Sequence, residues 1–238
     1  MQKPSPVTSR TSARRRRGRL AALMLLLPCL NACGDSPVAS AAGYFRIGIL
    51  GGPNLAMTRD DVAKIPYASI AVRQGRGAQA FVVLAKIDAT SQQWISADKH
   101  LIETRNGRIT KTIGFEADLT HTDFITPDPI QNHLDPAKTY ANDRLIDVTD
   151  HAGITGDAPT DAILVRSTFT CQGPQTITIL GKPIQTNLWT ETFTAPDIKW
   201  TETNKYWQDQ TTRTIWKTQQ HITPKSPKID IELLRRYE

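Results

Sequence analysis

Long hydrophobic runs are absent from this sequence, and its longest apolar stretch is too short to cross a membrane as a helix. That stretch, residues 20–30, is eleven residues long and is interrupted by Pro28. A spanning helix needs about 20 apolar residues, because each residue rises ~1.5 Å through ~30 Å of hydrocarbon. The run instead has the length of the apolar centre of an export signal.

Acidic residues are also missing from the first part of the chain. Residues 1–32 contain seven Lys and Arg and no Asp or Glu. A basic segment, a short apolar run and then small residues follow the order of a bacterial secretory signal, so we predict that residues 1–32 are cleaved. The 29 basic residues less these seven leave 22 against 23 acidic ones, a net charge of −1. The basic character of the whole chain therefore does not indicate a nucleic-acid partner.

Cysteine is scarce, and two of the three cysteines lie at the end of the apolar run. The sequence Leu30-Asn31-Ala32-Cys33 looks like a lipobox, in which the cysteine receives lipid. Cys29 is the rival, but the preceding Pro28 suits the signal peptidase poorly. The resemblance predicts a diacylglycerol and an N-acyl chain on Cys33, each buried methylene adding ~0.8 kcal/mol to membrane binding. An ordinary secretory signal with incidental cysteines is the alternative reading.

The residues after Cys33 bear on its destination. Resemblance to bacterial lipoproteins implies the periplasmic face of the outer membrane, because Gly34 rather than an Asp follows the cysteine. Residues 33–43 are small and polar, and they read as a lipidated tether that reaches at most ~35 Å when extended. Residues 44–238 are then long enough for one domain with a substantial core.

Acylation of Cys33 would leave Cys171 without a partner, so no disulfide is expected to hold this domain. Cys171 lies in the alternating segment "LVRSTFTC". We interpret it as a packed strand residue rather than as a reactive thiol.

The domain itself has the pattern of a mainly β protein. Asn106-Gly107 lies between β-compatible arms and predicts a two-residue hairpin. Other strand pairs are predicted around the Gly-rich turn of "VRQGRGAQ" and around residues 208–212, with a last strand in "KIDIELLRR". The segment "ILVRSTFTCQGPQTITILGKPIQTNLWTETF" predicts three strands, with turns at residues 172–174 and 181–182. About ten short strands indicate a single antiparallel β-sandwich or incomplete barrel.

Helix is scarce. The segment "TRDDVAKI" predicts one short helix, with Thr58 as N-cap, Asp61 completing a capping box and Pro66 ending it. A second short helix is expected within residues 135–145.

Four segments carry a resemblance to a known family: "IPYASIAVRQGRGAQAFVVLAKI", "QWISADKHLIETRNGRITKTIGFEADL", "GKPIQTNLWTE" and "KYWQDQTTRTIWKTQQHITP". In order and spacing they closely resemble the YjbF/GfcB (YmcC) lipoproteins of exopolysaccharide and group 4 capsule loci, from about residue 65 to the end. The resemblance implies a β-rich outer-membrane lipoprotein that acts in polysaccharide export beside a periplasmic partner and a porin-like outer-membrane protein. It supplies no catalytic residues.

Evidence for an enzyme is weak in the residues themselves. The five histidines are scattered: His100, His121, His133, His151 and His221. The segment "DLTHTD" brings Asp118, His121 and Asp123 close together as candidate metal ligands, although solvated turns share this composition. A glycosidase needs two facing carboxylates, and the sequence offers four for which surface solvation is the simpler explanation: Asp60, Asp61, Glu191 and Glu202. We predict no catalytic and no metal site.

Tryptophan is concentrated near the C-terminus, where Trp189, Trp200, Trp207 and Trp216 fall within 28 residues. Indole rings stack on sugar faces, but tryptophans in a domain of this kind more often pack the core. Trp207, beside a polar turn, is expected to be the most exposed, and Trp189 and Trp216 are the other candidate glycan contacts.

Together these observations predict a non-enzymatic outer-membrane lipoprotein that assists export or surface assembly of an extracellular or capsular polysaccharide. It would dock to periplasmic and porin-like outer-membrane export proteins, without nucleic acid and with no cofactor besides the lipid on Cys33. A polysaccharide-binding module is the first alternative, and a carbohydrate-active enzyme is the second.

Overall fold

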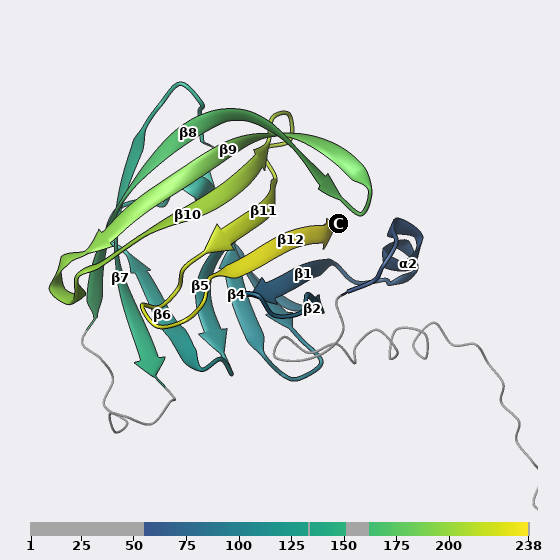
Figure 1. Cartoon of the computed structure of the whole chain (residues 1–238), viewed down its shortest axis with the longest axis horizontal. Helices are drawn as coiled ribbons and strands as arrows, with labels where there is room; N and C mark the ends of the chain where they lie inside the picture. The colour runs from purple at the N-terminus through teal and green to yellow at the C-terminus, as the bar shows by residue number, and fades with distance from the viewer. Residues whose placement is uncertain (1–54, 133, 151–161, 238) are drawn as a thin grey trace, which may run out of the picture. The chain divides into compact units, whose positions relative to one another are not determined.

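The computed structural model describes residues 55–132, 134–150 and 162–237 (Figure 1). The predicted signal peptide, Cys29, Cys33 and the tether lie outside the described residues, as do His133 and His151. Within the described ranges no helix is long and apolar enough to cross a membrane.

Twelve strands lie within these residues, and they form one antiparallel sheet. They are β1 (Ser69–Gln74), β2 (Ala80–Asp88), β3 (Ser91–Ile95), β4 (Leu101–Arg105), β5 (Arg108–Ile113), β6 (Ala117–Phe124), β7 (Tyr140–Asp150), β8 (Ile163–Ile179), β9 (Lys182–Ala195), β10 (Trp200–Asp209), β11 (Ile215–Gln220) and β12 (Ile229–Arg235). Their order across the sheet is β5-β4-β3-β2-β1-β12-β11-β10-β9-β8-β7-β6. Each strand therefore pairs with its neighbours in sequence, except that β5 and β6 do not pair with each other and that β1 pairs with β12.

The two ends of this order, β5 and β6, are consecutive in the chain and meet through side chains. The Thr112 hydroxyl accepts from the Leu119 backbone N–H at 2.9 Å, and the Thr122 hydroxyl donates to the Thr110 carbonyl at 3.0 Å. The sheet thus curls into a nearly closed barrel. The prediction of a mainly β fold is confirmed, and of its two forms the incomplete barrel is the one observed.

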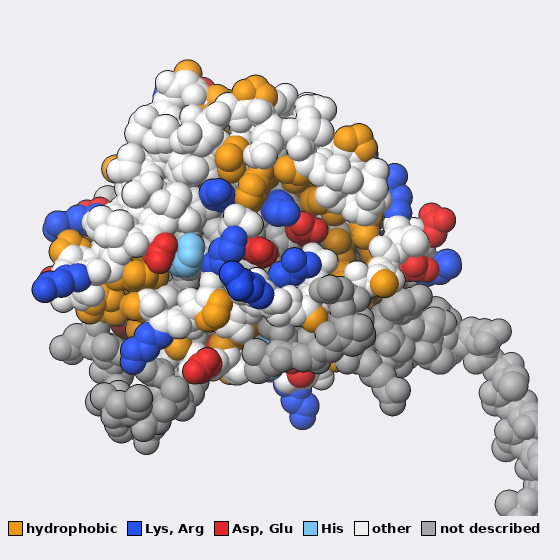
Figure 2. All heavy atoms as spheres, in the orientation of Figure 1, with side chains coloured by type: hydrophobic (Ala, Val, Ile, Leu, Met, Phe, Trp, Pro, Cys, Tyr) orange, Lys and Arg blue, Asp and Glu red, His pale blue; other side chains and the backbone are white. Residues whose placement is uncertain are grey.

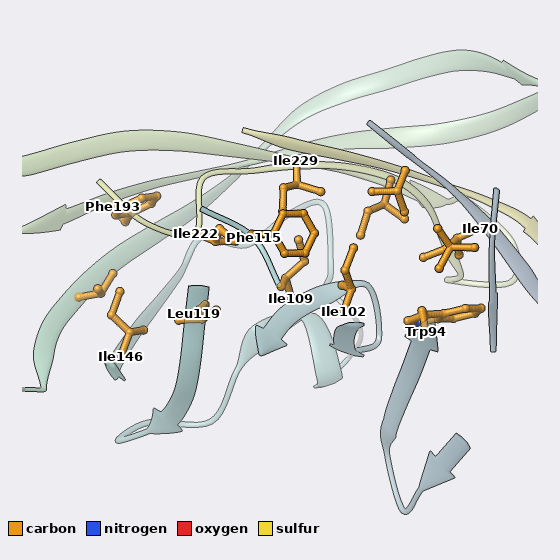
Figure 3. Close-up of a cluster of buried hydrophobic side chains, with 14 of the residues drawn as sticks. Ile70, Trp94, Ile102, Ile109, Phe115, Leu119, Ile146, Phe193, Ile222 and Ile229 are labelled. Carbon is orange, nitrogen blue, oxygen red and sulfur yellow. The ribbon is translucent and has the colours of Figure 1, made fainter. Parts of the chain in front are cut away.

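The main core fills the interior between the two walls of the barrel. In Figure 3, Phe193 and Ile229 on one wall point toward Ile146 and Ile102 on the other. This arrangement follows from the two-residue period of strands, which sends alternate side chains inward.

Phe81 points outward from β2, and the helix α2 (Arg59–Lys64) covers it, with Val62 and Ile65 packed against the ring. The predicted capping box is confirmed, because Thr58 and Asp61 each bond the other's backbone N–H.

The turn predicted at residues 172–174 is wrong, because β8 runs through it as one long strand. The register with β9 passes from Cys171 to Gly173, so Gln172 is the extra residue of a β-bulge. Gly173 has a φ of 97°, which suits glycine at such a position. Pro174 has no N–H to donate, and β8 tolerates it because pairing with β7 ends at Phe169 and leaves that side of β8 unpaired.

The second helix predicted within residues 135–145 is also wrong. Residues from Tyr140 onward belong to β7, in which Asn142, Arg144 and Ile146 are buried at every second position. Because Asn142 and Arg144 are polar, the alternation of buried and exposed positions in this strand does not appear as an alternation of hydrophobicity in the sequence. Short 3-10 helices instead lie at η1 (Pro129–Asn132) and η2 (Pro196–Ile198).

The predicted Asn106-Gly107 hairpin is confirmed, with φ angles of 46° and 87°. The turn reaches the opposite wall, because a Cβ on Gly107 would lie 2.9 Å from Ile215 Cγ2 on β11. Gly107 is therefore required both by its backbone angle and by this close approach.

We expect Gly107→Ala to destabilise the chain more than the same change at Gly181, in the β8–β9 turn. Gly181 has a φ of 73° but no atom within 4 Å of an added Cβ. The loss of stability in Gly181→Ala therefore measures only the cost of the left-handed backbone, about 1–2 kcal/mol. Gly107→Ala adds the displacement of buried Ile215, for a total of roughly 3 kcal/mol. Urea unfolding of both variants measures the difference, and equal losses would mean that the contact with Ile215 costs nothing.

Candidate functional site

A cluster of charged side chains lies inside the barrel, and we call it the polar centre. It consists of Arg108 on β5, Arg144 on β7, Glu191 on β9 and Asp128, just before η1. Arg108 bonds Asp128 through Nε at 2.7 Å and through Nη2 at 3.1 Å, and its Nη1 lies 3.0 Å from Glu191 Oε2. Arg144 Nη1 lies 2.6 Å from Glu191 Oε1. Two cations and two anions thus compensate one another in the interior.

Neutral groups complete the bonding of Glu191. The Tyr206 hydroxyl donates to Glu191 Oε2 at 2.8 Å, and Asn204 Nδ2 donates to the same oxygen at 3.0 Å. Gln220 Nε2 donates to the Gly107 carbonyl at 2.8 Å, and its Oε1 accepts from the Ile109 N–H at 3.0 Å. The polar centre therefore ties β9, β10 and β11 to the β4–β5 hairpin on the opposite wall.

These contacts set the protonation states. Burial alone would raise the pKa of Glu191, but the Arg108 and Arg144 guanidiniums hold it well below its usual range. Burial raises the pKa of Tyr206 well above its ordinary value, so the phenol keeps its proton. Burial would lower the pKa of Arg108, but Asp128 and Glu191 raise it, so Arg108 remains charged.

This arrangement bears on the four carboxylates considered for acid–base chemistry. Glu191 is ionised and both its oxygens are occupied, so it has no proton to donate at neutral pH. Asp60 and Asp61 lie in the first turn of α2, where Asp61 caps the helix. Glu202, on β10, lies 3.7 Å from His221 Nε2. The structure does not bring these four carboxylates together as a facing pair.

The candidate metal ligands of β6 lie in different environments. Asp118 is buried, where it accepts from Thr112 Oγ1 at 2.8 Å and from the Gly114 N–H at 2.9 Å. His121 and Asp123 are instead exposed. Among the described residues no group of three or more His, Cys, Asp or Glu side chains is placed to hold a metal ion.

Cys171 is a free, half-buried cysteine. It packs against the smaller interior cluster formed by Phe169, Trp189 and Tyr206, as expected for a strand residue.

Two of the three tryptophans considered as glycan contacts are buried. Trp189 has no exposed surface and packs in that interior cluster. The expectation that Trp207 is the most exposed is wrong, because only 6% of it is accessible. Lys217 Nζ lies 5.7 Å from the centre of its ring, and its indole N–H donates to Gln175 Oε1 at 2.7 Å. Gln175 lies on the long β8–β9 hairpin, which the sequence did not predict because residues 172–174 have the composition of a turn.

Trp216 is the half-buried member of the three, and it lines a cavity that we call the mouth cavity. This cavity has a volume of about 540 Å³ and lies between β3 and β4 on one side and β11 and β12 on the other. Ile70, Trp94 and Ile231 of the main core form part of its lining. Sequence reasoning missed Trp94 as a cavity residue, since only the fold brings it opposite Trp216.

The mouth cavity is lined by polar and basic groups as well as by aromatic ones. Arg235 and Arg236 contribute positive charge, whereas the Lys217 ammonium is paired with Glu232, and among the described lining residues none is acidic. Its volume falls in the range of about 300–1,000 Å³ that is typical of small-molecule sites.

Comparison with known proteins gives concordant matches. The model of the family described as "Group 4 capsule polysaccharide lipoprotein gfcB, YjbF" matches residues 44–234. Two proteins of Escherichia coli (strain K12) are each 26% identical to this chain: the uncharacterized lipoprotein GfcB, over 77% of this chain and 83% of that protein, and the uncharacterized lipoprotein YjbF, over 79% and 84%. The crystal structure of the hypothetical lipoprotein YmcC from E. coli (K12) superposes with a TM-score of 0.66, at 22% identity, over 76% of this chain and 90% of that one.

Proposed function

Because this chain belongs to the group 4 capsule polysaccharide lipoprotein family, we propose that it assists export or surface assembly of an extracellular or capsular polysaccharide. It acts from the periplasmic face of the outer membrane, anchored through acylated Cys33, and catalyses no reaction itself. The observation that carries this proposal is the family match across residues 44–234, which covers the described strands except for the last residue of β12.

The organisation of the domain supports a binding or docking role. The polar centre is internally compensated, and Glu191 has neither a free oxygen nor a proton to transfer. These ion pairs occupy the interior of the barrel and leave its rim and outer faces for other molecules. Periplasmic and porin-like outer-membrane export proteins are the partners proposed for those faces.

A deletion strain complemented with the wild type or with Cys33→Ser tests the proposal. We expect polysaccharide to accumulate inside the deletion strain, and we expect the wild type but not Cys33→Ser to restore it to the surface and the medium. Loss of rescue is expected because one serine removes the acyl chains that hold the protein at the membrane. Intact-mass measurement of the wild type should show cleavage before Cys33 and the lipid increment.

Two results would contradict this proposal. Unchanged polysaccharide in every compartment of the deletion strain would remove the export role. Full rescue by Cys33→Ser, at equal protein level, would remove the requirement for the anchor.

An enzymatic role would leave a different trace. Shorter polysaccharide chains in the presence of the wild type than in the deletion strain would indicate cleavage by this protein. We expect equal chain lengths.

A further inference from the structure

The mouth cavity differs in charge from the outer surface beside it. On the outer face of β11 and β12, Lys and Arg side chains are interspersed with Asp and Glu (Figure 2). There Lys217 Nζ lies 2.6 Å from Glu232 Oε1, and Lys228 Nζ lies 3.6 Å from Asp230 Oδ1. Cations on that face are therefore balanced by neighbouring carboxylates.

The two arginines that line the mouth cavity are held differently. Arg235 Nη1 donates to the backbone carbonyls of Ala63 and Ile65 at the end of α2. Arg236 Nη1 donates to the Thr214 hydroxyl at 3.3 Å. Neither guanidinium is ion-paired with an Asp or Glu among the residues that the structure describes. Among the described residues, therefore, no carboxylate pairs with either of the two positive charges at the cavity.

The aromatic rings of the cavity are fixed in orientation. The Trp94 indole N–H donates to Thr104 Oγ1 at 2.8 Å, and the Trp216 indole N–H donates to Asp209 Oδ2 at 3.0 Å. The Arg236 guanidinium lies 5.7 Å from the centre of the Trp216 ring. Because both indole N–H groups are already bonded, neither ring offers the cavity a donor. Trp216, which is half-buried, presents apolar ring surface, whereas only 3% of Trp94 is accessible.

Hydroxyl and amide groups complete the lining. Gln92 on β3, Thr104 on β4 and Asn106 in the β4–β5 turn line the cavity, and Tyr237, which is 52% exposed, lies at its edge. Aromatic surface, hydroxyl and amide groups, and arginines that have no ion pair within the described part of the chain together suit a ligand with apolar C–H faces, many hydroxyls and a negative charge. A hexose that carries a carboxylate has these three properties.

We propose that the mouth cavity binds an acidic sugar unit, a hexose ring bearing a carboxylate. The carboxylate accepts hydrogen bonds from Arg236, which keeps further donors free, and the ring packs against the half-buried indole of Trp216. The idea that the unit belongs to the exported polymer rests on the proposed function. Trp207 and Trp189, buried elsewhere, take no part in this site.

Binding of trigalacturonate to the full-length lipoprotein in detergent tests the site. The matched probe is the same trisaccharide after reduction of its carboxyl groups to alcohols, which preserves ring and linkage. We expect trigalacturonate to quench tryptophan fluorescence saturably. The reduced form should bind with a dissociation constant at least roughly ten-fold higher, the change expected for loss of a charge-assisted hydrogen bond. Equal binding of the two forms, or no binding of trigalacturonate, would overturn the proposal.

Variants locate the site. Arg236→Gln and Trp216→Leu are each expected to weaken binding roughly ten-fold or more, because each removes a group that contacts the ligand. Arg76→Gln, at an exposed position in the β1–β2 turn, removes an equal charge and should bind like the wild type. Far-ultraviolet circular dichroism and thermal midpoints close to those of the wild type verify folding. Undiminished binding by both cavity variants would place the ligand elsewhere and overturn the proposal.

The same variants in cells separate this inference from the proposed function. If the deletion strain exports normally, the export role fails, whatever the binding result. If Cys33→Ser abolishes export but the Arg236→Gln, Trp216→Leu double variant supports it fully, then the cavity does not serve export and only the anchored role stands. Loss of export in the double variant, with normal protein level and localisation, supports both.

Discussion

Glu191→Gln should lower the free energy of unfolding by about 3–5 kcal/mol, the cost typical of removing one partner from a buried ion-pair network. Glutamine keeps the size of the side chain but removes its negative charge. That charge is the carboxylate partner of Arg144 and one of the two carboxylate partners of Arg108. Arg108 would retain Asp128, whereas Arg144 would keep, among the described residues, the neutral partners Asn142 and Ser167. Urea unfolding at pH 7 measures the loss.

The matched control is Glu116→Gln, at an exposed position in the turn between β5 and β6. It removes the same charge without removing a buried partner, so its effect should stay within about 0.5 kcal/mol. Similar losses in both variants would mean that the cost follows net charge rather than the polar centre.

The pH dependence of the Glu191→Gln loss provides a second test. The pKa of Glu191 is lower in the folded chain than its ordinary value of 4.5, so ionised Glu191 stabilises the fold fully above pH 4.5. This contribution disappears as the pH falls through the folded pKa, because the folded carboxylate must then be protonated. The wild type should therefore lose stability more steeply than Glu191→Gln below pH 4.5. Parallel acid profiles would contradict an ionised, charge-paired Glu191.

The fold was largely predictable because local signals agree with the tertiary structure. Asn106-Gly107, the Thr58 capping box and most alternating segments specify their elements without long-range contacts. The failures lie where a local signal has two structural outcomes. Gly173-Pro174 reads as a turn, but the unpaired side of β8 accommodates the proline and a bulge accommodates the glycine.

The polar centre was not predictable from the sequence, although it organises the interior. Arg108 and Arg144 occupy inward positions of strands, where a reading by hydrophobicity expects apolar residues. Their partners come from distant segments, Asp128 from a loop and Glu191 from β9, and only the barrel brings them within hydrogen-bond distance. A charged residue at an inward position of an otherwise alternating strand is the signal that could have identified them.

Tryptophans close together in sequence are expected to have very different energetic roles. Trp189→Ala should cost about 3–5 kcal/mol, because a fully buried indole leaves a large cavity beside Phe169 and Tyr206. Trp189→Phe should cost less, since it keeps an aromatic ring and its buried indole N–H has no hydrogen-bond partner among the described residues. Urea unfolding followed by circular dichroism measures both changes without relying on tryptophan fluorescence.

Trp216→Leu is the comparison that gives this prediction its meaning. Trp216 is half-buried at the mouth cavity, so its replacement should cost no more than about 1 kcal/mol and should act mainly on ligand binding. The two residues are close in the sequence, but the fold places them differently. Trp189 lies in the core, and Trp216 lies at the rim of the barrel. Equal destabilisation by Trp189→Ala and Trp216→Leu would make Trp216 a core residue, and its proposed contact with sugar would then lose its structural basis.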